Sequence, residues 1–90
     1  MIHKKEDIKY PVTINLKVIM TSDSGDEKNI RDLNEILNKF DIPLKKEWVI
    51  SKSNAGNYMC YTGHVYIASK DVMYMLFEEL KKHQSVKFAI

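Results

Sequence analysis

The sequence predicts a small α+β fold in which a four-stranded sheet is covered on one face by two helices. Apolar and polar residues alternate in Val12–Met20 and again in Tyr58–Ala68, which is the period of a strand with one buried face. Between Ile30 and Phe40 the apolar residues recur at spacings of three and four, which is the period of a helix packed on one side. The 90 residues are 44% hydrophobic and 29% charged, a globular composition for one small domain.

The first strand follows residues 1–9, a charged segment without periodicity that we interpret as a flexible arm. Pro11 stands at the strand entrance, where its missing N–H does little harm. The predicted inward residues are Val12, Ile14, Leu16, Val18 and Met20. The opposite face carries Thr13, Asn15 and Lys17, with Ile19 as the one apolar exception. This strand therefore belongs to a sheet with one covered and one open face.

A break at residues 21–26 precedes the first helix. Ser24 and Glu27 have the spacing of a capping box, which predicts the helix start. The buried stripe of this helix is Ile30, Leu33, Ile36, Leu37 and Phe40. Pro43 disfavours helical geometry at Ile42, so the helix ends before it.

The second strand is predicted over Leu44–Ser51, with Leu44, Lys46, Trp48 and Ile50 on one face and Lys45, Glu47 and Val49 on the other. Its two adjacent lysines are typical of an edge strand. The segment Asn54–Asn57 contains the residues of a tight turn and leads directly into the third strand. These two strands therefore form a hairpin.

The third strand is predicted to be central, with Met59, Tyr61, Gly63, Val65 and Ile67 facing the core. Gly63 indicates a gap that admits a neighbouring ring, such as that of Trp48 or Phe77, or else a bulge. The alternative is a close approach of a ligand to the backbone. The open face receives Tyr58, Cys60, Thr62, His64 and Tyr66.

Ser69 is predicted to cap the second helix, whose buried stripe is Met73, Leu76, Phe77 and Leu80. Val86–Ile90 forms the last strand. With right-handed crossovers, this element order gives a ferredoxin-like βαββαβ sandwich over residues 10–90. Its antiparallel sheet has the strand order 4-1-3-2, and both helices lie on one face.

Charge and composition exclude several classes of function. The net charge of +2 is too small to indicate nucleic acid binding by itself. A single cysteine and the absence of a signal-peptide pattern predict a cytoplasmic protein. Cys60 and His64 are four residues apart on one strand, about 13 Å, too far for a catalytic dyad. No metal-ligand spacing or phosphate-binding glycine pattern occurs, so we expect no enzyme, cofactor or metal site.

The open sheet face is the candidate interaction surface, because its predicted residues are more apolar and aromatic than those of an ordinary solvated face. It comprises Asn15, Lys17, Val49, Tyr58, Cys60, Thr62, His64 and Tyr66. We expect a protein partner or self-association there. One alternative is an RNA-binding module that stacks bases on Tyr58 and Tyr66, although the first strand lacks the aromatic that such modules carry. A second is that long side chains of Lys17, Lys87 and Glu47 simply cover the rings.

Three segments resemble the YbeD-like family of small bacterial proteins. Tyr10–Ile19 is similar to the opening of that family. Ser51–Tyr58 is similar to its S-S-K-G-N-Y turn, with one residue more. Phe77–Leu80 and Val86–Ile90 match its Y-E-E-L and V-x-M-V-L ending, so that the resemblance covers residues 10–90. Gly63 departs from the aliphatic residue that the family usually has there.

The resemblance implies a fold similar to the ACT regulatory domains of amino-acid enzymes. It also implies a non-enzymatic regulatory or binding role, with a suspected link to lipoate or one-carbon metabolism and a possible small-molecule ligand. The family supplies no catalytic residue that could be carried over to this chain.

Overall fold

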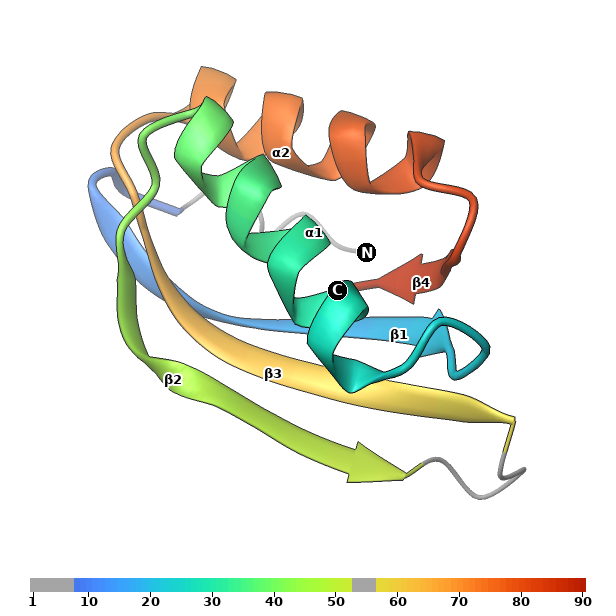
Figure 1. Ribbon diagram of the computed structural model, residues 1–90. Helices are drawn as coiled ribbons and strands as arrows, with labels where there is room; N and C mark the ends of the chain where they lie inside the picture. Colours follow the sequence, from blue (N-terminus) through green and yellow to red (C-terminus); the bar gives the residue numbers. More distant parts are fainter. Residues whose placement is uncertain (1–7, 53–56) are drawn as a thin grey trace, which may run out of the picture.

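A computed structural model describes residues 8–52 and 57–90 and contains the six predicted elements in the predicted order (Figure 1). The strands are β1 (Val12–Thr21), β2 (Leu44–Lys52), β3 (Tyr58–Ile67) and β4 (Val86–Ala89). The helices are α1 (Asp26–Lys39) and α2 (Lys70–Lys82). Within the described ranges, neither helix is long and apolar enough to cross a membrane.

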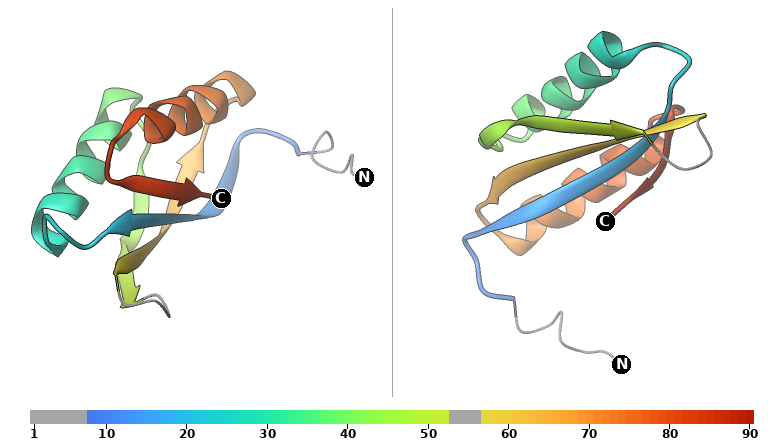
Figure 2. Two further views of the ribbon diagram at one scale, coloured as in Figure 1. Left: turned by 90° about the vertical axis from the view of Figure 1, so that its right-hand side faces the viewer. Right: turned by 90° about the horizontal axis from the view of Figure 1, so that it is seen from below.

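The four strands form one antiparallel sheet in the order β2-β3-β1-β4, which is the predicted order read from the other edge. Both helices pack on the same face of this sheet (Figures 1 and 2). The view from below looks onto the opposite face, which no helix covers (Figure 2, right). The ferredoxin-like, ACT-like sandwich is therefore confirmed.

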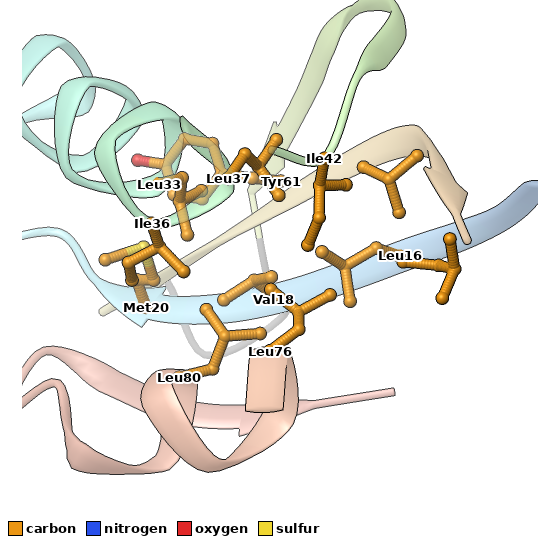
Figure 3. Close-up of a cluster of buried hydrophobic side chains, with 12 residues drawn as sticks. Leu16, Val18, Met20, Leu33, Ile36, Leu37, Ile42, Tyr61, Leu76 and Leu80 are labelled. Carbon is orange, nitrogen blue, oxygen red and sulfur yellow. The ribbon is translucent and has the colours of Figure 1, made fainter. Parts of the chain in front are cut away.

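The β1–β3 pair is the most regular part of the sheet, with an unbroken register from Val12 opposite Ile67 to Thr21 opposite Tyr58. Its inward side chains fill the space under the helices, where they meet Leu33, Ile36, Leu37, Leu76 and Leu80 (Figure 3). Leu16, Val18, Met20, Tyr61, Val65 and Ile67 are completely buried. The predicted faces of both central strands are confirmed.

The two helices begin differently. Ser69 caps α2 as predicted, because its hydroxyl accepts a hydrogen bond from the backbone N–H of Val72 at 3.3 Å. The capping box predicted for α1 is wrong, since the helix starts one residue later, after Gly25, and no side chain caps it. Gly25 has φ 87°, a conformation that a glycine adopts without steric cost, so backbone geometry sets this boundary.

Strand β2 departs from simple alternation. Leu44 lies opposite Val65 on the core side, but the register shifts before Lys46, which lies opposite His64 on the open side. It shifts again before Val49, which lies opposite Thr62. The prediction that Lys46 shares a face with Leu44 and Trp48 is therefore wrong, because each shift reverses the face that follows.

Two predictions fall on segments outside the described residues. The tip of the β2–β3 turn, residues 53–56, is one of them, although the antiparallel pairing of β2 with β3 is itself described. Most of the predicted arm, residues 1–7 of 1–9, is the other, so the arm stays a prediction.

Candidate interaction face

The eight predicted interaction residues all lie on the open face of the sheet. The strand register arranges them in rows that run across the sheet. One row places Val49, Thr62 and Lys17 side by side, and the next places Lys46, His64 and Asn15. Cys60, Tyr58 and Tyr66 extend the face along β3, each half-buried. The residues are therefore brought together as one surface.

Lysine side chains lie over both tyrosine rings of this face. The Lys87 ammonium is 5.8 Å from the centre of the Tyr58 ring, and the Lys45 ammonium is 5.8 Å from that of Tyr66. Such contacts are worth about 0.5–1 kcal/mol at exposed sites. The alternative that long side chains cover the rings is therefore correct for Lys87, which lies over Tyr58. The side chain over Tyr66 is that of Lys45, which was not among the three that we expected to cover the rings. The rings are partly covered by hydrocarbon and cation rather than bare.

The sequence analysis missed the apolar end of this face. Phe88 lies opposite Ile19, and Ile90 exchanges two backbone hydrogen bonds of 2.9 Å with Lys17, so both belong to the open side. Phe88 is 53% exposed and Ile90 is 61% exposed, which makes them more accessible than either tyrosine. The sequence does contain a signal for this placement. Phe88 and Ile90 are two residues apart in the predicted last strand, so they are expected to share one face of the sheet.

The charged residues of the four strands are mostly basic. The strands contain five lysines, at positions 17, 45, 46, 52 and 87, and a single acidic residue, Glu47. Glu47 lines a hollow beside α1. The other described acidic residues lie in the helices and the loops. The open face is therefore a basic surface with apolar residues at both edges, Val49 on one side and Phe88 and Ile90 on the other.

Cys60 and His64 are the candidate reactive side chains of the open face. The Cys60 thiol lies 3.9 Å from the Thr62 hydroxyl, and no hydrogen bond joins it to His64 within residues 8–52 and 57–90. In the same ranges no three ligating side chains come together in a way that could hold a metal ion. The expectation that Cys60 and His64 form no catalytic dyad stays a prediction.

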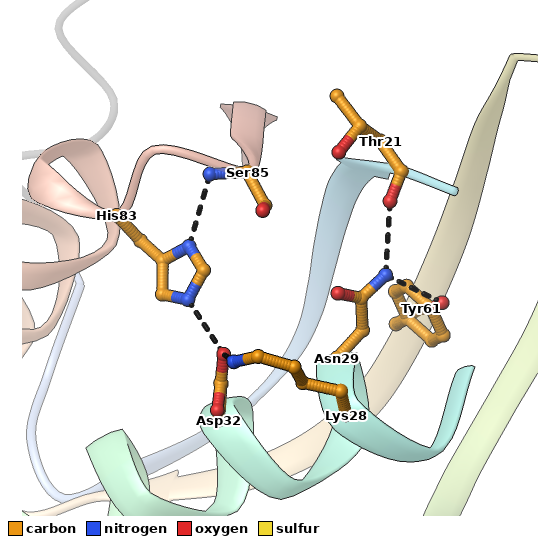
Figure 4. Close-up of polar contacts among 7 residues, drawn as sticks. All are labelled: Thr21, Lys28, Asn29, Asp32, Tyr61, His83 and Ser85. Carbon is orange, nitrogen blue, oxygen red and sulfur yellow. Dashed lines mark hydrogen bonds and ion pairs between the residues drawn. The ribbon is translucent and has the colours of Figure 1, made fainter. Parts of the chain in front are cut away.

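A buried polar network lies on the other side of the sheet, under the start of α1. Asn29 is completely buried and donates to the Thr21 carbonyl and to the Tyr61 hydroxyl, each at 3.0 Å (Figure 4). Tyr61 in turn donates to Asp26 at 2.6 Å. Burial, and then the bond to Asp26, raise the pKa of Tyr61 to about 12, so this hydroxyl stays protonated. The network anchors α1 to the two central strands.

A second polar cluster joins α1 to the end of α2. Nδ1 of His83 accepts a hydrogen bond from the Ser85 backbone N–H at 3.1 Å, so this nitrogen carries no proton (Figure 4). Nε2 therefore carries the proton and donates it to Asp32 at 2.9 Å. Lys28 also donates to Asp32, at 2.8 Å. No sequence pattern predicts this cluster, because Asp32 and His83 are 51 residues apart.

Asp32 makes part of the stability dependent on pH. Its hydrogen bonds from Lys28 and then from His83 hold the carboxyl pKa below the ordinary 3.8. A lowered folded-state pKa contributes stability above the unfolded pKa, and this contribution is lost as the pH falls through the folded value. We expect Asp32→Asn to cost on the order of 1 kcal/mol at pH 7 and progressively less below pH 4, measured by urea unfolding.

The matched control for Asp32→Asn is Asp23→Asn, which removes the same charge from an exposed loop residue. The side chain of the Asp32→Asn variant can still accept the hydrogen bond from His83. The difference in unfolding free energy between the two variants therefore isolates the effect of the charge at position 32. A cost that stays constant from pH 7 to pH 2, or an equal cost in both variants, would contradict the assignment.

Comparisons with known proteins place this fold in a family. Residues 5–90 match the family described as "Protein of unknown function (DUF493)". The solution structure of HP0495 from H. pylori superimposes with a TM-score of 0.72 at 21% identity, covering 97% of this chain and 89% of that one. The C-terminal domain of the MgtC protein from Mycobacterium tuberculosis gives 0.70 at 15% identity, covering 93% and 88%. No curated protein matches.

The two structural neighbours are too distant in sequence to show more than the shared fold. The family match is different in kind, because it spans nearly the whole chain and includes every element of the sheet and both helices. It also agrees with the resemblance carried by Tyr10–Ile19 and by the chain's last strand. The chain therefore belongs to the DUF493 family of proteins of unknown function, the family of the YbeD-like proteins.

Proposed function

We propose that this domain is a non-enzymatic, ACT-like regulatory or binding module that contacts an acidic protein surface through its open sheet face. The observation that carries the proposal is the combination of charge and exposure on that face. Four lysines, at positions 17, 45, 46 and 87, lie on it or over its tyrosine rings. Val49, Phe88 and Ile90 supply exposed apolar area beside them. Interfaces of this kind combine apolar anchors with charges that select the partner.

Self-association through the same face is the alternative within this class. A face-to-face dimer would place the lysines of one copy against those of the other, and like charges across an interface are costly. A partner with carboxylates opposite Lys17 and Lys46 avoids this cost. The proposal therefore favours a different, acidic protein over a second copy of this chain.

The proposed role is regulatory rather than catalytic, and we place it in the cytoplasm. The family resemblance suggests a link to lipoate or one-carbon metabolism as the setting. The same fold occurs in the C-terminal domain of the MgtC protein, where it is one domain of a longer chain. This precedent supports a role in contact with another protein or domain.

RNA binding is the candidate from another class, favoured by the same lysines and by the two tyrosines. Its weakness is geometric. Tyr58 and Tyr66 are eight residues apart on β3, about 26 Å at ~3.3 Å per residue, which is far beyond the spacing of neighbouring bases. The adjacent positions on β1 hold Thr13, Asn15 and Lys17 rather than an aromatic. A base-stacking platform across the two central strands is therefore incomplete.

The test is capture of partners from native cell extract on the immobilised domain, with and without nuclease. The variant Val49→Asp, Phe88→Asp replaces the exposed apolar residue at each edge with a carboxylate. We expect nuclease-resistant protein partners on the wild type that elute with salt, and at least a tenfold loss of them on this variant. The control is Tyr74→Asp, which changes an exposed residue of α2 on the helical side.

Two outcomes would overturn the proposal. One is capture of the same proteins by the wild type and by the Val49, Phe88 variant. The other is partners that disappear with nuclease and an affinity for single-stranded RNA that falls steeply with salt, which would support the RNA-binding alternative.

A further inference from the structure

A hollow of about 370 Å³ opens between α1 and β2, on the helical side of the sheet. Its walls are Ile30 and Asn34 of α1 and Leu44, Glu47, Trp48 and Ile50 of β2. Leu44 and Ile50 lie opposite the buried Val65 and Tyr61, which places the hollow on the other side of β2 from the interaction face. Its volume falls in the range of small-molecule sites.

The lining is mostly hydrocarbon with an aromatic ring. Ile30, Leu44 and Ile50 supply aliphatic surface, and Ile50 is 39% exposed. The Trp48 indole N–H already donates to Asn34 Oδ1 at 2.9 Å, so the indole has only its ring surface left to offer a ligand. The same bond leaves the Asn34 side-chain N–H₂ group as the donor of the hollow.

Glu47 gives the hollow its charge. It is the only carboxylate on the four strands, and it forms no ion pair with any of the described residues. The lysines next to it in sequence are turned away, since Lys45 lies over Tyr66 and Lys46 lies opposite His64. The hollow therefore combines an unneutralised anion, a ring face and aliphatic walls.

We propose that this hollow binds a primary ammonium group carried on a short hydrocarbon chain. The ammonium would pair with Glu47 beside the Trp48 ring, and the chain would lie against Ile30, Leu44 and Ile50. A carboxylate ligand would be repelled by Glu47, and a neutral ligand would gain no attraction from this exposed carboxylate. A strand added along β2 is disfavoured, because this edge carries two register shifts and three lysines. The inference is independent of the open face.

The test uses n-hexylammonium as the probe and Trp48 as the reporter, since the chain contains a single tryptophan. We expect a saturable change in Trp48 emission. We also expect amide chemical-shift changes confined to Ile30, Asn34, residues 44–50 and the indole N–H. Hexan-1-ol, of the same length but neutral, should bind about tenfold more weakly, and hexanoate should give no saturable change.

The matched variants are Glu47→Gln and Glu35→Gln, which make the same charge change on different surfaces. Glu35 lines the groove between the two helices, so its variant should bind n-hexylammonium as the wild type does. Glu47→Gln should weaken this binding to the level of hexan-1-ol. Equal responses to the three probes, equal effects of the two variants, or shift changes outside the hollow would overturn the proposal.

Discussion

Replacing Leu16 with aspartate is expected to unfold the domain. Leu16 is completely buried at the centre of β1, opposite Gly63 and beneath the helices, where no cation lies among the core residues (Figure 3). An unpaired charge in such a place costs several kcal/mol, which is comparable to the whole stability of a small domain. Far-UV circular dichroism and urea unfolding measure the loss.

The control is Asn15→Asp, one residue earlier on the same strand. Asn15 is exposed on the open face, opposite His64 and in the same row as Lys46, so a carboxylate there is hydrated and meets a basic surface. We expect a change below about 0.5 kcal/mol. If Leu16→Asp does not express in folded form, Leu16→Ala should still lose about 2–5 kcal/mol. Similar losses at positions 15 and 16 would mean that the register of β1 is wrong.

The contrast between these neighbours explains why the fold could be predicted from the sequence. In β1 and β3 the buried and open sets alternate with a strict period of two, and the register between them is unbroken. In both helices the apolar residues follow the helical period. Once these four elements were identified, the right-handed crossovers fixed the strand order. Local pattern and global packing therefore favour the same structure.

The errors in the fold occurred where local pattern does not determine the backbone. Alternation through β2 placed Lys46 on the core side, and it could not reveal the two register shifts that turn this lysine outward. Ser24 and Glu27 have the composition of a capping box, yet Gly25 allows a helix start without one. Both errors arise because a shift or a positive φ depends on the neighbouring strand and the loop rather than on the residue pattern.

The candidate site was predicted only in part, because the local residue pattern determines the face of a residue but not its long-range contacts. Period two assigned the eight open-face residues correctly to one side, because seven of them lie on the regular strands β1 and β3 and the two register shifts of β2 cancel before Val49. Of the two lysines that lie over the rings, Lys87 was among the candidates and Lys45 was not, because such contacts depend on side chains that reach across strands. Asn29 with Tyr61, and Asp32 with His83, were also missed, because each pair joins residues 32 or 51 positions apart. The sequence contains no periodic signal for such long-range polar contacts.

Gly63→Ala is expected to destabilise the domain by about 1–3 kcal/mol, because the space that a glycine leaves is filled by Trp48. A Cβ atom at position 63 would lie 2.7 Å from Cζ3 and 2.8 Å from Cε3 of the indole ring, and 3.0 Å from Leu44 Cδ1. The indole ring is rigid and is held by its hydrogen bond to Asn34, so the steric clash can be relieved only if the indole moves outward. Urea unfolding measures the loss, and red-shifted Trp48 emission reports the displacement.

Gly63→Ala should have the opposite effect on stability once the Trp48 ring is removed. Alanine in place of glycine reduces the conformational entropy of the unfolded chain, which is worth about 0.4–1 kcal/mol where the native backbone allows it. Gly63 has no positive φ, so the backbone allows it, and in the wild type this gain is smaller than the cost of the clash. In a Trp48→Leu background, Gly63→Ala should therefore be neutral or stabilising, measured by circular dichroism in urea. An equal loss in both backgrounds would show that contact with Trp48 is not the reason for glycine at this position.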